Sequence, residues 1–300
     1  MIGEQLASLL RHAGVDCRVY ADVDSLVETA PRTWPVLLWS TNNRQSVFDA
    51  VKLRFHGFRA VRYWVGGDVL RLTQMARFAG ACVAWLNRQL FLRHATNSAW
   101  LSAELEPLGL SSTPLPVSPV CCASHWPLTP FPPFPYRVIY YSLPDNDHIY
   151  LPDVAEFCAR SNPEVELVCV GHPDAPVRGA NVTRLGVLRP DEMRGLYETC
   201  HCLLRFTSHD GLPRSVLEAL GNGLDVVTNL DVPHVMRVDS REQATSALGS
   251  LCRTRQGRNL AGREWVLEEH SAESFVARLQ AQFGRDLTPA MNAQTPGSIA

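Results

Sequence analysis

Apolar runs of strand length alternate with helical patterns along nearly the whole chain, and this alternation limits the possible folds most. The expected strands are VDCRVY at 15–20, VLLWS at 36–40, AVRYWVG at 60–66, RVIYYS at 137–142, VELVCVG at 165–171, HCLLRFT at 201–207 and DVVTN at 225–229. Helical patterns such as SVFDAVKLRFHG and DVAEFCARS lie between them. Buried strands that alternate with helices are typical of α/β proteins with parallel sheets. We therefore predict an α/β fold.

A proline-rich stretch divides the chain into two such series. Proline cannot hold a regular helix or an inner strand, so we expect residues 119–135 to form a linker. The linker separates an N-terminal domain, 1–118, from a C-terminal domain, 136–284, and residues 285–300 have the small polar composition of a disordered tail. The first domain begins almost directly on a helix, so either the start lies late or its first strand is missing.

Composition and charge exclude several classes of protein. The net charge of -2 gives no overall attraction to nucleic acid, so we expect no nucleic-acid partner. The nine cysteines lack paired spacing, which favours reduced thiols in the cytosol. The sequence shows neither a signal peptide nor a membrane-spanning run. We expect a cytoplasmic protein, either soluble or peripheral on the inner membrane.

The stretch 47–95 combines cations with aromatic residues. Its basic residues are Lys52, Arg54, Arg59, Arg62, Arg71, Arg77, Arg88 and Arg93, interleaved with Phe55, Phe58, Trp64, Phe78, Trp85 and Phe91. Such a stretch could dock on anionic lipid headgroups, because cations near an anionic membrane surface are attracted to it. An ordinary solvated face explains the same composition if the residues do not share one side.

The segment that follows the strand at 201–207 has the chemistry of an anion site. Pro213 suits the first position of a helix, where its missing N–H would have had no partner. The N–H groups of Ser215 and Val216 would then point out of the helix start and, with the helix dipole, attract a diphosphate. Gly211 permits close approach to the backbone.

Two carboxylates flank this expected anion site. Asp210 lies just before it and Glu218 lies about a turn and a half into the helix. Carboxylates repel phosphate but accept hydrogen bonds from hydroxyls, so they suit a sugar on one side and a ribose on the other. The alternative is a capped helix that carries one buried, hydrogen-bonded carboxylate.

At this point the residues resemble a known pattern. The segment HDGLPRSVLEALGNGLDVV at 209–227 looks like the Glu-x7-Glu segment of retaining GT-B glycosyltransferases of the glycosyltransferase family 4 type. Asp210 replaces the first glutamate, and Leu224-Asp225 replaces the usual x-Pro. The resemblance extends over nearly the whole chain but is specific only at 181–229. It implies the GT-B architecture, in which two Rossmann-like domains face each other across a cleft.

The resemblance also implies roles for residues. Glu218 would bind the ribose, Asp210 the donor sugar, and the backbone at Arg214, Ser215 and Val216 the diphosphate. Gly171 and Leu188, at the ends of the similar strand segments, would also contact the donor. The implied reaction is a retaining, metal-independent hexosyl transfer without a cofactor. Its donor would be a UDP- or GDP-linked sugar and its acceptor a glycan or lipid-linked molecule, in bacterial surface polysaccharide or lipopolysaccharide synthesis.

The chain departs from the family in one important loop. The family carries an arginine and a lysine after the first strand of the second domain, whereas this chain has the acidic SLPDNDHIY at 142–150. Arg205, His209 or Arg214 could replace them, since the planar fork of arginine suits phosphate. The acidic loop and short N-terminus favour one alternative, a degenerate GT-B protein acting as a binding or scaffold subunit. The other alternative is a sugar-nucleotide epimerase.

Two weaker patterns complete the candidate site. Gly66, Gly67 and Asp68 follow a strand and could line the acceptor side, although a tight turn explains them almost as well. The triplets Asp22-Val23-Asp24 and Asp145-Asn146-Asp147 match the metal–diphosphate clamp of the other main glycosyltransferase fold. Such triplets are common in turns, so we expect no metal.

Overall fold

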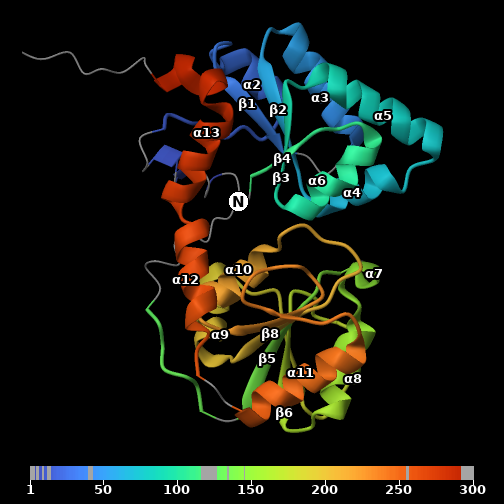
Figure 1. The fold of residues 1–300 in the computed structure, drawn as a ribbon, viewed down its shortest axis with the longest axis vertical. Helices are drawn as coiled ribbons and strands as arrows, with labels where there is room; N and C mark the ends of the chain where they lie inside the picture. The colour runs from blue at the N-terminus through green and yellow to red at the C-terminus, as the bar shows by residue number, and fades with distance from the viewer. Residues whose placement is uncertain are drawn as a thin grey trace, which may run out of the picture. The chain divides into compact units, whose positions relative to one another are not determined.

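The chain divides into two compact units (Figure 1). The computed structural model describes residues 4, 7–8, 10–11, 15–39, 43–115, 127–133, 135–144, 146–254 and 257–291. Unit 1 comprises Met1–Pro119 with Ala272–Ala300, and unit 2 comprises Val120–Ser271. None of the helices in this described part is both long enough and apolar enough to cross a membrane.

Unit 1 contains a four-stranded parallel sheet in the order β1-β2-β3-β4. Its strands are β1 (Pro35–Trp39), β2 (Arg59–Trp64), β3 (Arg93–Thr96) and β4 (Thr113–Pro114). Its helices are α2 (Val23–Thr29), α3 (Asn43–Phe55), α4 (Gly66–Thr73), α5 (Arg77–Leu90), α6 (Ala99–Leu105) and α13 (Ala272–Met291), with a 3-10 turn η1 (Glu106–Leu108). The expected strand at 15–20 is irregular instead, and the carbonyl of Cys17 accepts a hydrogen bond from Arg11.

Helix α13 belongs to unit 1 rather than to the C-terminal half. Phe275 and Leu279 pack with Tyr63 and Leu115 of the sheet. Gln282 accepts a hydrogen bond from Arg93 at 3.1 Å through its carbonyl. The chain returns to unit 1 at residue 272, within the range 136–284 that we expected for the C-terminal domain. The helix also runs past the expected tail boundary at 285, and residues 292–300 lie outside the described part.

Unit 2 contains a six-stranded sheet in the order β10-β9-β8-β5-β6-β7, in which all pairs are parallel. The strands are β5 (Tyr136–Tyr141), β6 (Val165–Val170), β7 (Val182–Gly186), β8 (Cys202–Arg205), β9 (Asp225–Thr228) and β10 (Met236–Arg237). The helices are α7 (Asp147–Tyr150), α8 (Pro152–Ser161), α9 (Pro190–Thr199), α10 (Arg214–Gly221), α11 (Arg241–Thr254) and α12 (Leu260–Glu269). This strand order is that of a six-stranded Rossmann fold.

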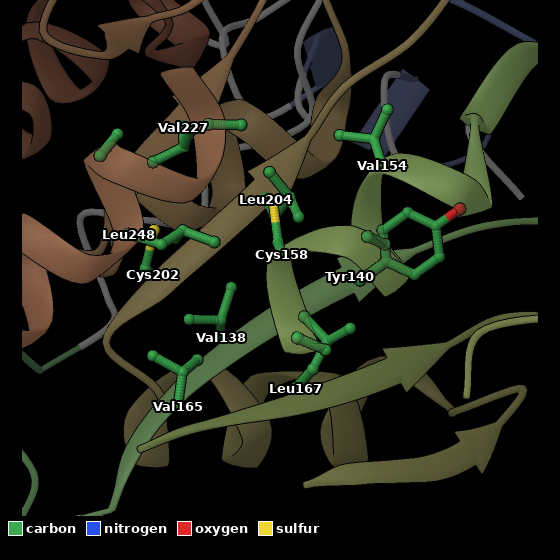
Figure 2. Close-up of a cluster of buried hydrophobic side chains, with 14 of the residues drawn as sticks. Val138, Tyr140, Val154, Cys158, Val165, Leu167, Cys202, Leu204, Val227 and Leu248 are labelled. Atoms are coloured by element: carbon green, nitrogen blue, oxygen red, sulfur yellow. The ribbon is translucent and has the colours of Figure 1, made fainter. Parts of the chain in front are cut away.

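The core of unit 2 explains the apolar strand sequences. Figure 2 shows alternate residues of four strands pointing to one face, where they meet helices α8 and α11. These residues include Val138, Tyr140, Val165, Leu167, Cys202, Leu204 and Val227. Residues at the intervening positions, such as Ile139, Val168 and Leu203, are also buried. Burial on both faces requires the near-continuous apolar runs that are typical of parallel strands. The cysteines in the described part are free thiols, and most are buried among these side chains.

The described end of the expected linker is held against unit 2. Residues 127–133 have no regular structure, but the guanidinium of Arg258 binds them through several hydrogen bonds. Its Nε donates to the carbonyl of Thr129 at 3.2 Å, and its Nη2 donates to the carbonyl of Pro130 at 3.1 Å. Its Nη1 donates to the carbonyl of Cys200 at 3.0 Å. Arg258 therefore fastens this segment to the start of β8.

Strand β9 begins at a carboxylate whose burial makes stability depend on pH. Burial raises the pKa of Asp225 to about 6, well above its usual range. The unfolded chain releases this proton first, so the free energy of unfolding falls as pH rises from about 4 to about 6 and stays lower above. We expect Asp225→Asn to stabilise the protein at pH 8 by about 1–2 kcal/mol, a value reduced for solvent screening. Urea unfolding should show almost no gain at pH 4; an equal gain at both pH values would contradict this assignment.

Candidate functional site

The sheet of unit 2 has one point at which its strand order reverses. The chain runs from β5 outward to β6 and β7, and then crosses to the other side of β5 to form β8, β9 and β10. In open parallel sheets, ligands bind beyond the carboxyl ends of the strands at such a switch point. Here the two strands that meet at this point end at Tyr141 and Arg205. The sequence-predicted motif follows β8 directly, so the fold places it at this position.

Arg205 is a buried cation at the end of β8. Its side chain is 7% exposed, and its Nη2 donates to Oδ2 of Asp210, whose side chain is 23% exposed. The guanidinium also lies over the ring of Tyr150, 4.6 Å from the centroid. Burial alone would lower the pKa of Arg205, but the adjacent Asp210 charge outweighs it and the pKa is raised. Nε and Nη1 are buried without a hydrogen-bond partner in the described part of the chain.

Helix α10 begins one residue later than expected. Pro213 is its N-cap, with extended backbone angles, and Arg214 is its first residue. The N–H of Val216, which we predicted would face an anion, instead donates to the carbonyl of Pro213 at 3.1 Å. Val216 is fully buried, whereas Ser215 is partly exposed, and neither its N–H nor its hydroxyl has a hydrogen-bond partner among the described residues. Ser215 therefore offers both an N–H and a hydroxyl at the helix start.

Glu218 lies on α10 with both carboxylate oxygens engaged. Nε of Arg214 donates to Oε1, and the hydroxyl of Tyr197 on α9 donates to Oε2 at 3.0 Å. Burial and the nearby Glu218 charge raise the pKa of Tyr197 well above its usual range, so its hydroxyl stays protonated. The Glu218 side chain remains 16% exposed. Both predicted carboxylates thus have an arginine partner, Arg214 from within the motif and Arg205 from the end of β8.

The two loops on either side of the switch point are joined to each other. The N–H of Ser208 donates to the carbonyl of Ile149 at 2.9 Å, and its hydroxyl donates to the carbonyl of His148 at 2.8 Å. The loop after β5 and the motif loop after β8 therefore form one surface. Asp145 of the acidic loop lies outside the described residues. His209 lies in the motif loop and is partly buried.

Gly171 and Leu188 lie at the same edge of the sheet. Gly171 follows β6 directly, with φ of 93°, and a Cβ there would meet the carbonyl oxygen of Ser142 at 2.1 Å. This glycine is therefore required by the close approach of the backbone after β5, whatever else it contacts. Leu188 lies in the loop between β7 and α9 and is partly exposed. Gly211 is buried in the motif loop.

The predicted acceptor-side residues lie at the start of α4 in unit 1, where Asp68 has a structural role. Its side chain is completely buried and caps the helix, because Oδ1 accepts from the N–H of Val65 at 2.8 Å. Its other oxygen lies 3.8 Å from Nη2 of the equally buried Arg62. Burial raises the pKa of Asp68 to about 7, although Arg62 opposes the shift. Gly66 is buried as well, and only Gly67 of the three is exposed.

Local structure explains one of the acidic triplets. Asp22 caps α2 by accepting from the N–H of Ser25 at 2.7 Å, and Asp24 pairs with Lys52. The second triplet, at 145–147, falls partly on residues outside the described part. Within that part, no group of three or more histidine, cysteine or acidic residues is arranged to hold a metal ion.

Two aromatic residues of the site were not anticipated. Tyr150 stacks on Arg205, and Tyr197 holds Glu218. Tyr150 lies in the acidic loop after β5, and Tyr197 lies on α9, the helix before β8. For Tyr197 the available signal was its apolar position on the helix, because a buried tyrosine hydroxyl usually has a hydrogen-bond partner.

Comparison with known proteins identifies the fold. No protein-family model and no curated protein matches the sequence. Among solved structures, sucrose-phosphate synthase from Thermosynechococcus elongatus matches with a TM-score of 0.66 and 15% identity, over 96% of this chain and 93% of that one. HepE of Anabaena in complex with UDP-glucose matches with a TM-score of 0.65 and 11% identity, over 93% and 88% of the two chains.

A third match extends the similarity to a longer enzyme. The pneumococcal O-GlcNAc transferase GtfA, in complex with UDP and GlcNAc, matches with a TM-score of 0.61 and 12% identity. The match covers 88% of this chain and 59% of that one. At such low identities the similarity establishes architecture alone. The chain has the GT-B fold, with two Rossmann-like domains, and the predicted fold class is confirmed.

Proposed function

We propose that the protein is a glycosyltransferase that uses a nucleotide diphosphate sugar as its donor. One observation carries this proposal: two arginine–carboxylate pairs, Arg205–Asp210 and Arg214–Glu218, surround the start of α10 at the switch point. HepE, which has a similar fold, was solved with UDP and with UDP-glucose. The proposed reaction moves a hexose, with retention of configuration and without a metal, to a glycan or lipid-linked acceptor in bacterial surface polysaccharide or lipopolysaccharide synthesis.

The paired carboxylates can still bind hydroxyls. An ionised carboxylate has about four acceptor positions, and the Arg214 and Tyr197 bonds to Glu218 occupy two of them. The remaining two suit the vicinal hydroxyls of a ribose. We assign Asp210 to the hydroxyls of the donor sugar. Because each carboxylate is balanced by an arginine, a diphosphate between them is not repelled by uncompensated negative charge.

The cations supply the proposed catalytic effect. The reaction develops negative charge on the departing diphosphate, and preorganised donors aimed at that charge are usually the largest single term in catalysis. Arg205 is fixed by Asp210 and Tyr150, so little reorganisation is needed during the reaction. Arg214 and the N–H of Ser215 lie at the helix start, where the dipole acts in the same direction. The acceptor hydroxyl would lose its proton to the leaving phosphate.

A thermal-shift screen of UDP- and GDP-sugars tests the proposal. A ligand present at about 100 times its Kd stabilises the folded state by about 2.7 kcal/mol, which corresponds to a rise in Tm of roughly 5 °C or more. We expect such a rise for one nucleotide class, and we expect Glu218→Gln to remove most of it. Tyr197→Phe should weaken donor binding by a smaller factor, because it removes one hydrogen bond to Glu218 but leaves the charge of the Glu218 carboxylate in place. Slow hydrolysis of the bound donor would then support transfer.

The same observation favours a second candidate, a degenerate GT-B protein that serves as a binding or scaffold subunit. The carboxylates of Asp210 and Glu218 are already paired with arginines of this chain. The motif loop is also hydrogen-bonded to the loop at 142–150, which has an acidic sequence. In this case no nucleotide sugar raises the Tm, and Glu218→Gln changes only stability. That outcome would reject the transferase proposal.

A further inference from the structure

Helix α3 carries an apolar stripe on its solvent side. Ser46, Ala50 and Leu53 are buried and define the face that packs on the unit. Phe48 and Phe55 lie on the opposite face, because residues spaced by seven share one side of a helix. They are 70% and 86% exposed. Val51, 48% exposed, lies between them on this face.

Helix α5 repeats the arrangement. Gly80, Ala84 and Asn87 are its buried face. Phe78 and Trp85, again seven residues apart, lie on the opposite side and are 83% and 53% exposed. The two helices contact each other and lie side by side in unit 1 (Figure 1). We call the surface formed by Phe48, Val51, Phe55, Phe78 and Trp85 the aromatic face.

Cations flank the aromatic face without acidic partners. Arg54, Arg77 and Arg88 are exposed, and none of them forms an ion pair or hydrogen bond through its side chain within the described residues. Helix α5 contains no acidic residue, and α3 contains only Asp49, which accepts a hydrogen bond from Gln45 at 2.7 Å. A chain with a net charge of -2 therefore has a local excess of positive charge beside exposed aromatic rings.

We propose that the aromatic face docks on an anionic lipid bilayer. Aromatic and aliphatic side chains on one side of a helix, flanked by arginines, insert at the boundary between headgroups and acyl chains, while the cations contact lipid phosphates. A second copy of this chain fits less well, because a two-fold contact would bring the same unpaired arginines together. The proposed docking surface is only part of the basic stretch at 47–95. Arg62, Phe58 and Phe91 of that stretch are buried and do not belong to it. The inference is independent of the proposed donor site.

Vesicle co-sedimentation of the full chain tests this assignment. We expect binding to phosphatidylcholine vesicles that contain phosphatidylglycerol and little binding to phosphatidylcholine alone. Arg54→Gln/Arg77→Gln/Arg88→Gln should lower the partition coefficient roughly 100-fold, since each cation contributes roughly fivefold. Phe55→Ser/Phe78→Ser should lower it by roughly tenfold or more, because two rings lose their burial. Both variants should keep the wild-type Tm, as the side chains are exposed.

Matched variants on unit 2 serve as controls. Val187→Ser removes an apolar side chain that is 77% exposed, and Arg189→Gln/Arg194→Gln/Arg241→Gln removes the same charge as the triple variant. Both should bind vesicles like the wild type. Equal losses in the control variants would show general charge attraction and overturn the proposal. If the protein does not bind vesicles and forms a dimer that Phe55→Ser/Phe78→Ser dissociates, the proposal is overturned and the aromatic face binds a second copy. If the protein does not bind vesicles and is a monomer, the proposal is also overturned, and an acidic protein becomes the expected partner.

Discussion

Replacing Gly171 with alanine is expected to destabilise the C-terminal unit by about 3 kcal/mol or more. The φ of 93° alone costs a side chain about 1–2 kcal/mol. The added Cβ would also lie 2.1 Å from the carbonyl oxygen of Ser142, which is backbone and cannot turn aside. The N–H of Gly171 donates to the carbonyl of Gly186 at 2.7 Å, so the turn is held from both sides. For a unit of this size the loss corresponds to a fall in Tm of roughly 10 °C.

Gly195→Ala provides the control for this experiment. Gly195 lies within α9, is exposed, and has nothing within 4 Å of an added Cβ. Alanine is favoured over glycine inside a helix by about 0.8–1.0 kcal/mol, so this variant should be slightly more stable than the wild type. Calorimetry or urea unfolding of both variants distinguishes the two sites. If Gly171→Ala keeps the wild-type Tm, the turn after β6 can shift, and the close packing of the two strand ends is not required.

The buried parallel strands were predictable because one requirement, burial on both faces, determines most of their residues. Residues of β5, β6 and β8 face helices on both sides, so they are apolar almost throughout. The irregular segment at 15–20 has alternating polar and apolar residues that suit a strand, but a strand also needs a neighbour. The need for a pairing partner is a property of the tertiary structure and is invisible in a six-residue window.

Two of the helices that the sequence did not predict, α5 and α12, were missed for identifiable reasons. Helix α5 begins after Ala76, whose side chain makes no capping hydrogen bond, and it contains Gly80, so the sequence lacks the usual start signal. Helix α12 contains Gly262, which suggests a break, yet an added Cβ there would meet Leu220 of α10 at 2.7 Å. The glycine permits the two helices to approach closely. At Gly262, a contact with another helix determined the residue type.

The position of the candidate site was predictable, but its internal pairing was not. The strand, turn and helix around Asp210 and Glu218 follow from local sequence and from the resemblance. The Arg205–Asp210 pair depends on how the loop returns to the end of β8, and spacing alone does not determine this. Asp68, which we assigned to the acceptor side, is a buried helix cap, a role that its position after a strand does not reveal.

Arg205→Ala is expected to have the largest effect on the proposed activity. It removes the cation nearest the switch point and leaves the carboxylate of Asp210 without its partner. Breaking a buried ion pair costs about 3–5 kcal/mol, which we reduce to about 2–3 kcal/mol because Asp210 is partly exposed. Donor affinity should fall by roughly 100-fold or more, equivalent to about 2.7 kcal/mol. Titration calorimetry with the nucleotide sugar found in the screen measures this loss.

A double variant separates the loss of stability from the loss of binding. Arg205→Ala/Asp210→Ala removes both charges, so it should recover most of the stability that the single variant loses, since no buried charge remains unpaired. Donor binding should not recover, because the proposed site needs the guanidinium for the diphosphate and the carboxylate for the sugar. Arg205→Lys should retain the charge but lose the planar fork, so its donor affinity should lie between those of the wild type and Arg205→Ala. If instead the double variant binds the donor as tightly as the wild type, the pair is purely structural, and recognition of the diphosphate rests on Arg214 and the start of α10.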